Sequence, residues 1–189
     1  MRINQKSDLK IPSFPLPIYH TRNIAEAISK EGDFFSIFVG LDKEKVSQLE
    51  KLSLDENDME VQKNTSDKKR FGNKSYENWY KKNRIPFALI HSATNSLAAL
   101  IWFGPESLNR KSENWHTVAW RSYPSFRGKG LMKEFAKFAM DIYSKKISNA
   151  KFWITVKKEN IGSIKLAKFL GFHELENTPA SNVYFIMIK

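Results

Sequence analysis

The hydrophobic and polar positions along the chain form two kinds of pattern. Short apolar runs rich in β-branched and aromatic residues predict strands, whereas apolar residues three or four positions apart on a charged background predict helices. The predicted strands are residues 34–39, 87–91, 97–103, 116–121, 152–156 and 183–188. The predicted helices are residues 21–31, 42–52, 76–82, 131–143 and 161–170. Because strands and helices alternate in the second half, the pattern predicts an α/β fold with an antiparallel front and a β-α-β centre.

The segments between these elements complete the picture. Residues 92–96 join two of the strands and predict an antiparallel hairpin with a five-residue loop. Residues 1–20 contain three prolines, so this arm is expected to be extended and laid against the body. Residues 61–75 are polar and are expected to be mobile. No repeat or linker interrupts the pattern, and one domain spanning residues 1–189 is therefore expected.

Composition narrows the class of protein. With 189 residues, of which 41% are hydrophobic, the chain is long enough for one packed domain. It has no apolar run long enough to cross a membrane and no signal-peptide pattern, so a cytoplasmic protein without a membrane partner is expected. The absence of cysteine excludes disulfides, thiolate metal ligands and cysteine nucleophiles. The four histidines follow no metal-binding spacing, and no metal site is expected.

Positive charge is concentrated in the second half of the chain. Residues 1–77 carry 13 Lys and Arg against 13 Asp and Glu, whereas residues 78–189 carry 18 against 7, which accounts for the whole net charge of +11. Such a field attracts a polyanionic ligand or nucleic acid. Lysines on solvated helix faces also explain part of this excess.

A glycine turn lies in this basic half, between a predicted strand and a predicted helix. Its sequence is Arg127-Gly128-Lys129-Gly130-Leu131. Glycine permits positive φ and close approach of a ligand, and the first turn of a helix leaves unpaired N–H groups at the positive end of the helix dipole. Two basic side chains add charge, so the turn predicts an anion site. It matches neither a Walker A loop nor a Rossmann fingerprint.

Two further features follow the turn. Asn160 precedes the predicted helix 161–170 and fits its N-cap, and Gly171 fits its C-cap. The order Pro124-x-x-Arg127-Gly128-Lys129-Gly130-Leu131, a strand, Asn160-x-x-Ser163 and Gly171-Phe172 resembles the GNAT N-acetyltransferase superfamily, over about residues 85–189. The resemblance implies a mixed α/β fold, in which helices flank a central twisted, mostly antiparallel sheet with a splayed pair of parallel strands.

The resemblance also implies that the turn binds the pyrophosphate of acetyl-CoA, the co-substrate. The residues that it assigns to this binding are Ser122, Phe126, Arg127, Gly128, Lys129, Gly130, Leu131, Met132, Asn160, Ser163 and Lys168. Ser122 would lie where pantetheine pairs with the strand end, Asn160 would face the pantetheine or acetyl region, and Ser163 and Lys168 would line the adenine-diphosphate side. Met132 departs from the small residue usual at its position, but backbone N–H groups make most of the phosphate contacts. The phosphates of CoA would also be a ligand for the basic half.

For catalysis, the resemblance implies direct attack of an amine on the thioester. A base removes a proton, and a tyrosine commonly reprotonates the thiolate. Ala167 stands where that tyrosine is expected, so Tyr123, Ser163 or water is the alternative donor. The candidate bases are His116, Glu113 and Tyr123. Each also has a structural interpretation, respectively as a sheet residue, a solvated carboxylate and a packed aromatic.

The acceptor side of this family is shaped by the N-terminal helices and the segment near residues 55–80. An acidic cluster there could attract a cationic amine, or it could be an exposed helix end; it consists of Asp55, Glu56, Asp58 and Glu60. The leading hypothesis is an acetyl-CoA-dependent N-acetyltransferase acting on a small-molecule or peptide amine. The alternatives are an acyl-CoA sensor that has lost catalysis, suggested by Ala167, and a nucleic-acid-binding module, which is the least favoured. The acceptor and the oligomeric state, with a homodimer among the options, are left open.

Overall fold

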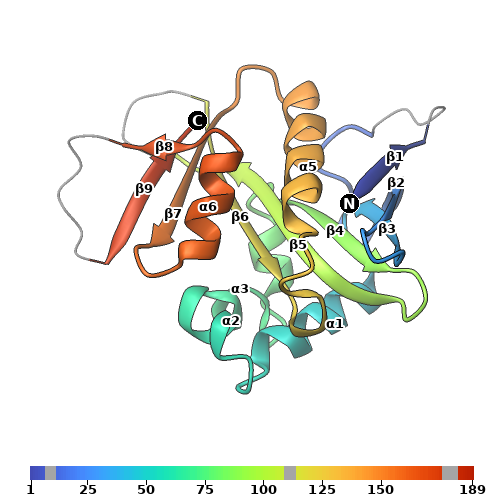
Figure 1. Ribbon diagram of the computed structural model, residues 1–189. Helices are drawn as coiled ribbons and strands as arrows, with labels where there is room; N and C mark the ends of the chain where they lie inside the picture. The colour runs from blue at the N-terminus through green and yellow to red at the C-terminus, as the bar shows by residue number, and fades with distance from the viewer. Residues whose placement is uncertain (7–11, 109–113, 176–182) are drawn as a thin grey trace.

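The computed structural model describes residues 1–6, 12–108, 114–175 and 183–189 and has a mixed α/β fold (Figure 1). The sheet formed by these residues has nine strands in the order β1-β2-β3-β4-β5-β6-β7-β9-β8. All neighbouring strands are antiparallel except β6 and β7, which are parallel. The expected fold class, a mostly antiparallel sheet with one parallel pair and flanking helices, is confirmed.

The elements have the following bounds. The strands are β1 (Arg2–Gln5), β2 (Arg22–Ile28), β3 (Phe34–Val39), β4 (Ile85–His91), β5 (Ser96–Pro105), β6 (Trp115–Ser122), β7 (Lys151–Lys157), β8 (His173–Glu174) and β9 (Tyr184–Ile188). The helices are α1 (Lys43–Leu54), α2 (Met59–Asn64), α3 (Asp67–Phe71), α4 (Tyr76–Tyr80), α5 (Met132–Lys146) and α6 (Ile161–Phe169), with a short 3-10 helix, η1 (Pro124–Phe126). In the part of the chain that the structure describes, no helix combines the length and apolar character needed to span a membrane.

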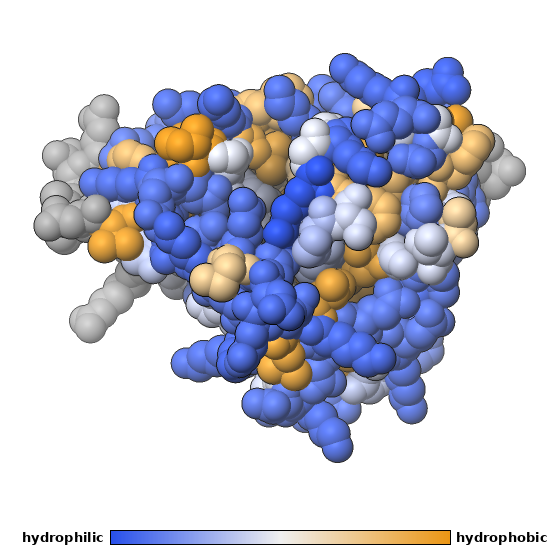
Figure 2. All heavy atoms as spheres, turned by 60° about the horizontal axis from the view of Figure 1, so that its bottom comes forward, coloured by the Kyte–Doolittle hydropathy of each residue, from blue (hydrophilic) through white to orange (hydrophobic). Residues whose placement is uncertain are grey.

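Helices cover both faces of the sheet, and each face has its own hydrophobic core. On one face, α5 and α6 contribute buried residues such as Phe135 and Leu166, which join Phe103 of β5 in one cluster. On the other face, α1, α3 and α4 form a cluster in which Trp79 packs edge-on against Trp102. Successive side chains of a strand point to opposite faces, so β5 supplies both cores. Hydrophilic side chains dominate the view toward α1, α2 and α3, and apolar ones gather there in small patches (Figure 2).

The segment before β2 lies against the body of the protein. The ring of Phe14 contacts the rings of Phe87 and Tyr143, with centroids 5.9 and 6.1 Å away. The Tyr80 hydroxyl donates a hydrogen bond of 2.7 Å to the carbonyl of Leu16. These contacts tie the N-terminal segment to both cores.

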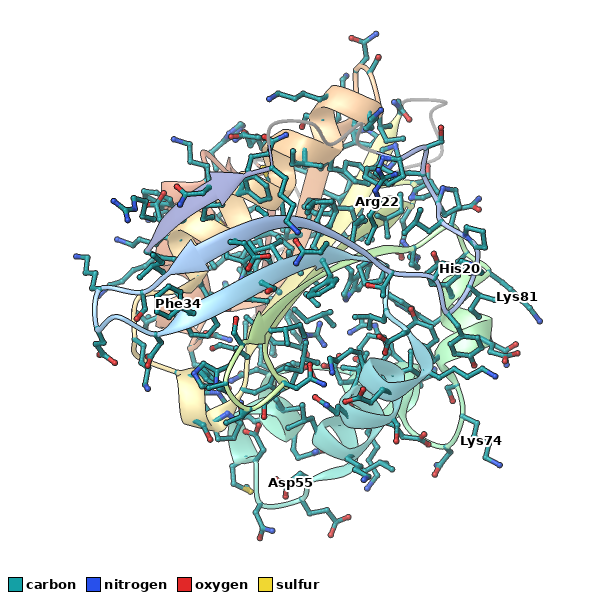
Figure 3. All side chains as sticks on the ribbon, turned by 90° about the vertical axis from the view of Figure 1, so that its right-hand side faces the viewer. His20, Arg22, Phe34, Asp55, Lys74 and Lys81 are labelled. Atoms are coloured by element: carbon teal, nitrogen blue, oxygen red, sulfur yellow. The ribbon has the colours of Figure 1, made fainter. Side chains whose placement is uncertain are left out.

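The prediction of a helix over residues 21–31 is wrong. This segment contains β2, which pairs antiparallel with β1 and β3. Its alanine and charged residues favour a helix when considered alone. Strand pairing overrides that propensity, because it buries Ile24, Ala25 and Ala27 in the core. The β2–β3 hairpin is seen from the side in Figure 3, with Phe34 at its turn end.

Two expectations about connecting segments are also corrected. Residues 61–75, expected to be polar and mobile, contain the end of α2 and all of α3. The carboxylate of Asp58 caps α2 by accepting a hydrogen bond of 3.2 Å from the Val61 N–H. The hairpin between β4 and β5 has residues 92–95 as its loop, because Ser96 already belongs to the second strand.

The parallel strands β6 and β7 separate toward their carboxyl ends (Figure 1). Their pairing stops after Thr117 and Trp153. Beyond this point β6 pairs only with β5 and β7 only with β9, so within the described parts of the chain each strand has one edge without a neighbouring strand. The start of α6, which follows β7 in the chain, lies beside this opening. Open α/β sheets commonly bind ligands in a crevice at the carboxyl ends of parallel strands.

Candidate active site

A cavity of about 390 Å³ lies where β6, α2, α5 and α6 meet. We call it the turn cavity because the glycine turn forms one of its walls. The residues that line it are Glu60, Val61, Asn64, Thr65, Trp120, Arg121, Ser122, Phe126, Arg127, Gly128, Gly130, Leu131, Met132, Lys133, Asn160, Gly162, Ser163, Lys165 and Leu166.

The glycine turn has the geometry of an anion site. Gly128 and Gly130 adopt φ of 76° and 67°, a left-handed conformation that other residues adopt only with strain. A Cβ at either position would meet no atom within 4 Å, so the backbone angle and not crowding explains the glycines. The following helix α5 has no side-chain cap at its N-terminus, unlike α1 and α6. The N–H groups of its first turn are therefore available to a ligand.

A second cavity, of about 370 Å³, lies in the opening between β6 and β7, and we call it the splay cavity. Both strands line it, together with residues of α2 and α3. It shares six residues with the turn cavity, and these are Asn64, Thr65, Trp120, Arg121, Asn160 and Ser163. The two cavities are therefore neighbouring parts of one site.

The start of α6 lies between the two cavities. Asn160 caps this helix, because its Oδ1 accepts a hydrogen bond of 3.0 Å from the Ser163 N–H. The Ser163 hydroxyl oxygen accepts a hydrogen bond of 3.3 Å from the Trp120 indole N–H and so connects α6 to β6. Ala167, one turn further along, is fully buried and carries no titratable group. Ser163 is thus the hydroxyl of α6 that lines both cavities.

Arg127 makes a bidentate ion pair with Asp58. Its two terminal nitrogens lie 2.7 and 2.6 Å from the carboxylate oxygens of Asp58, and its Nε donates a hydrogen bond of 2.9 Å to the Ser122 carbonyl. The Asp58 side chain is only 1% exposed. The guanidinium group therefore connects the glycine turn to α2, while most of its charge is balanced within the protein.

This ion pair makes stability depend on pH. Burial alone would raise the pKa of Asp58, but the hydrogen bonds from Arg127 and from the Val61 N–H outweigh burial and hold that pKa below its ordinary value. A depressed pKa stabilises the fold fully above the unfolded-state value of about 3.9, and the stabilisation is lost as the pH falls through the folded-state pKa. We expect the free energy of unfolding of the wild type to exceed that of Asp58→Asn most near neutral pH and progressively less below about pH 4. Urea unfolding between pH 3 and pH 7 measures this difference, and a constant difference would contradict the assignment.

The residues that the resemblance assigned to acetyl-CoA are mostly brought together. All of them line the turn cavity except Lys129 and Lys168. The Lys129 ammonium lies 3.7 Å from the Glu31 carboxylate, on the other side of η1. Two lysines that sequence reasoning did not single out, Lys133 and Lys165, line the cavity instead. Lys133 lies in the first turn of α5 and Lys165 lies one turn into α6, and these positions near the helix starts were the available signal.

His116 lies away from both cavities. Its ring nitrogens are 2.7 Å from the Tyr143 hydroxyl and 2.9 Å from the Asn114 side-chain oxygen. The residue is 5% exposed, and burial, followed by the charge of Arg84, lowers its pKa. A neutral imidazole with both nitrogens engaged favours a structural role within the core.

Replacing His116 by alanine is accordingly expected to leave the pH profile of the protein's activity unchanged. The same change should lower the free energy of unfolding by about 2 kcal/mol, because it leaves the buried Tyr143 hydroxyl without a partner. Steady-state rates between pH 6 and pH 9 and urea unfolding measure the two effects. A loss of activity of 100-fold or more in a folded variant would restore His116 as a candidate base.

The other two catalytic candidates have different outcomes. Tyr123 is buried, and burial strongly raises its pKa, so its hydroxyl stays protonated and suits proton donation better than proton removal. The charges of Arg121, Asp58 and Arg127 also act on this hydroxyl, although Tyr123 lines neither the turn cavity nor the splay cavity. Glu113 lies outside the described residues.

Comparison with known protein families matches this arrangement to one of them. The model of the acetyltransferase (GNAT) domain matches residues 30–173. The chain belongs to the GNAT acetyltransferase family. This GNAT match includes the glycine turn, both divergent strands and the start of α6.

Solved structures share the GNAT fold. The GNAT domain of S. lividans PAT superposes with a TM-score of 0.61 at 9% identity and covers 87% of this chain and 94% of its own. RimJ of Mycobacterium smegmatis in complex with CoA-disulfide has a TM-score of 0.63 at 11% identity, with coverage of 90% and 87%. Spermidine N-acetyltransferase from Vibrio cholerae, in complex with CoA and spermine, has a TM-score of 0.57 at 15% identity, with coverage of 81% and 94%. Comparison with curated protein sequences gave no match.

Proposed function

We propose that this protein is an acetyl-CoA-dependent N-acetyltransferase that transfers the acetyl group directly to a primary amine. The main observation that supports this proposal is that the turn cavity and the splay cavity adjoin and share six lining residues. The glycine turn and the uncapped start of α5 suit the pyrophosphate. The β6 edge beyond Thr117 lacks a neighbouring strand and suits the amide groups of pantetheine.

In this proposal, the thioester lies where the two cavities meet and the amine approaches from the splay cavity. The amine nitrogen forms a bond to the thioester carbon, the carbon–sulfur bond breaks, and CoA leaves as a thiolate. The amine proton passes to a base or to water, and the thiolate gains a proton. Ser163 is our candidate for a hydroxyl near the thiolate, because it lines both cavities. Alignment of the two reactants supplies much of the rate.

Solved GNAT proteins support this chemistry in a general way. The spermidine N-acetyltransferase and M. smegmatis RimJ were both solved with CoA or its disulfide. Related solved structures include acetyltransferases named for ribosomal proteins and for spermidine, and both of these acceptors carry amino groups. We therefore propose acetyl-CoA as the donor and either a small amine or a protein N-terminus as the acceptor class.

Thiol release from acetyl-CoA in the presence of a panel of amines tests this proposal. We expect amine-dependent release, with acetylated amine as the second product. Isothermal titration with CoA and with an RNA or DNA duplex should give heat for CoA alone. Failure to bind CoA would refute the proposal, and binding of the duplex alone would favour the nucleic-acid alternative.

A sensor that binds acetyl-CoA without turnover is the second candidate, favoured by Ala167. The side chain at this α6 position is a buried methyl group and cannot protonate a thiolate. CoA binding combined with no thiol release from any amine would support the sensor over the enzyme.

A further inference from the structure

The splay cavity is rich in cationic side chains. Among the residues that the structure describes, four basic ones line it and no Asp or Glu does; the basic ones are Lys63, Arg70, Arg121 and Lys157. The rest of the lining is polar or apolar and uncharged. Lys63 is partly neutralised by Glu159, whose carboxylate lies 3.2 Å away, and both of these side chains are more than half exposed.

The two arginines share one buried carboxylate. Arg121 forms an ion pair with Asp67, and Arg70 lies 3.6 Å from the other oxygen of the same carboxylate. The Asp67 side chain is 0% exposed and that of Arg121 is 4% exposed. The nearby guanidinium group of Arg84 forms an ion pair with Glu106, with a nitrogen–oxygen distance of 2.7 Å. Three guanidinium groups thus face two carboxylates, which leaves one positive charge in excess beside the cavity.

This excess charge is incompletely compensated by the protein. Burial lowers the pKa of Arg70 and lowers the pKa of Arg121 to about 10, because both guanidinium groups lose hydration. The Nε of Arg121 is buried and has no hydrogen-bond partner among the described residues. A buried cation with an unused donor is stabilised when an anion binds beside it.

The acidic cluster of residues 55–60 does not offset this charge. Asp58 is held by Arg127, and Glu56 lies 3.1 Å from the ammonium of Lys68. Asp55 is in the turn after α1, at the outer edge of the molecule (Figure 3). Glu60 lines the turn cavity but not the splay cavity. The sequence-based idea that this cluster attracts a cationic amine therefore has no support in the splay cavity.

We propose that the acceptor amine carries a carboxylate, which binds beside Arg70 and Arg121 in the splay cavity while the amine nitrogen faces the turn cavity. The inference rests on the proposed acetyltransferase function. Guanidinium groups suit a carboxylate because their paired N–H donors match its two oxygens. Lys157 adds a further positive charge from β7. The carboxylate can belong to a small amino acid or to an acidic residue next to a peptide N-terminus.

Pairs of acceptors that differ only in this group test the inference with the full chain and acetyl-CoA. β-Alanine is compared with β-alaninamide, and the peptide amide Ser-Asp-Ala with Ser-Asn-Ala; spermidine is the cationic reference. Rates are corrected for the fraction of free amine at the assay pH. In at least one pair, kcat/KM for the carboxylate member is expected to be tenfold or more higher. The pair with the larger ratio shows whether the carboxylate belongs to a small amino acid or to an acidic residue of a peptide. Equal use of both members in both pairs, or preference for spermidine, would overturn the inference.

Variants localise the effect. Arg70→Gln is expected to reduce the carboxylate preference about tenfold, through KM for the acceptor, and Lys157→Gln about threefold. Lys69→Gln, an exposed neighbour in α3 that lines neither cavity, is the matched control and should keep the preference. Melting curves and CoA titration verify that each variant is folded. A preference that survives both Arg70→Gln and Lys157→Gln would overturn the assignment to this cavity, and absence of thiol release with every acceptor would overturn the proposed function as well.

Discussion

Replacing Arg127 by methionine is expected to lower the free energy of unfolding by about 3 kcal/mol. Arg127 is the bidentate partner of Asp58, whose carboxylate is almost completely buried. Without the guanidinium group this carboxylate keeps the backbone hydrogen bonds from Val61 and Glu60 in α2 but loses its counter-ion. Loss of one partner of a buried pair is costly, because the remaining charge has neither water nor a counter-ion. Urea unfolding at pH 7 measures the loss.

Two comparisons separate the ion pair from other effects. The double variant Asp58→Asn/Arg127→Met should be more stable than Arg127→Met, because asparagine still caps α2 and no charge is left uncompensated. Lys129→Met, in the same turn, removes a cation from an exposed pair with Glu31 and should change stability by less than about 1 kcal/mol. Additive losses in the double variant, or equal losses for Arg127→Met and Lys129→Met, would contradict this account.

Removing both lysines of the turn cavity is expected to weaken CoA binding about 30-fold. Lys133 belongs to the first turn of α5, and Lys165 lies in α6 on the opposite wall. Both lysine side chains are exposed, so we assign about 1 kcal/mol to each phosphate contact, which is less than a buried charged hydrogen bond contributes. Isothermal titration of Lys133→Gln/Lys165→Gln with CoA gives the dissociation constant, and the loss should shrink at high salt.

The control pair for this test is Lys137→Gln/Lys145→Gln. Both of these lysines are exposed on α5 and line neither cavity, so CoA binding should change less than twofold. Lys168→Gln tests the sequence-based assignment of Lys168 to CoA binding. Because Lys168 lies on α6 outside the turn cavity, the structure predicts little change in CoA binding. A loss as large in Lys168→Gln as in the double variant, or none in the double variant, would contradict the role given to Lys133 and Lys165.

The glycine turn and the strands around it could be predicted from local signals. The φ values of Gly128 and Gly130 and the Asn160 cap depend on residues close in sequence, and the structure has them where the sequence indicates. The β2 strand could not be predicted in this way. Its alanines and charged residues favour a helix locally, and the pairing with β1 and β3 that overrides this preference is set by the tertiary structure.

Contacts between residues far apart in sequence explain why side-chain roles were harder to predict than backbone positions. Arg127 was expected to face phosphate, but Asp58, 69 residues away in sequence, holds its guanidinium group. His116 was a candidate base because of its residue type, and only the fold shows that Tyr143 and Asn114 occupy its nitrogens. The cationic splay cavity combines α3, β6 and β7, which no sequence window contains. The charge of such a pocket follows from packing and not from local composition.

The proposal that the glycine turn binds CoA is tested most directly by amide hydrogen exchange with and without this ligand. The uncapped N–H groups at the start of α5 should become phosphate donors, so exchange in residues 128–134 is expected to slow on addition of CoA. Protection should extend to the start of α6, which lines the same cavity. Unchanged exchange in residues 128–134 at saturating CoA, or protection confined to another surface, would contradict the account.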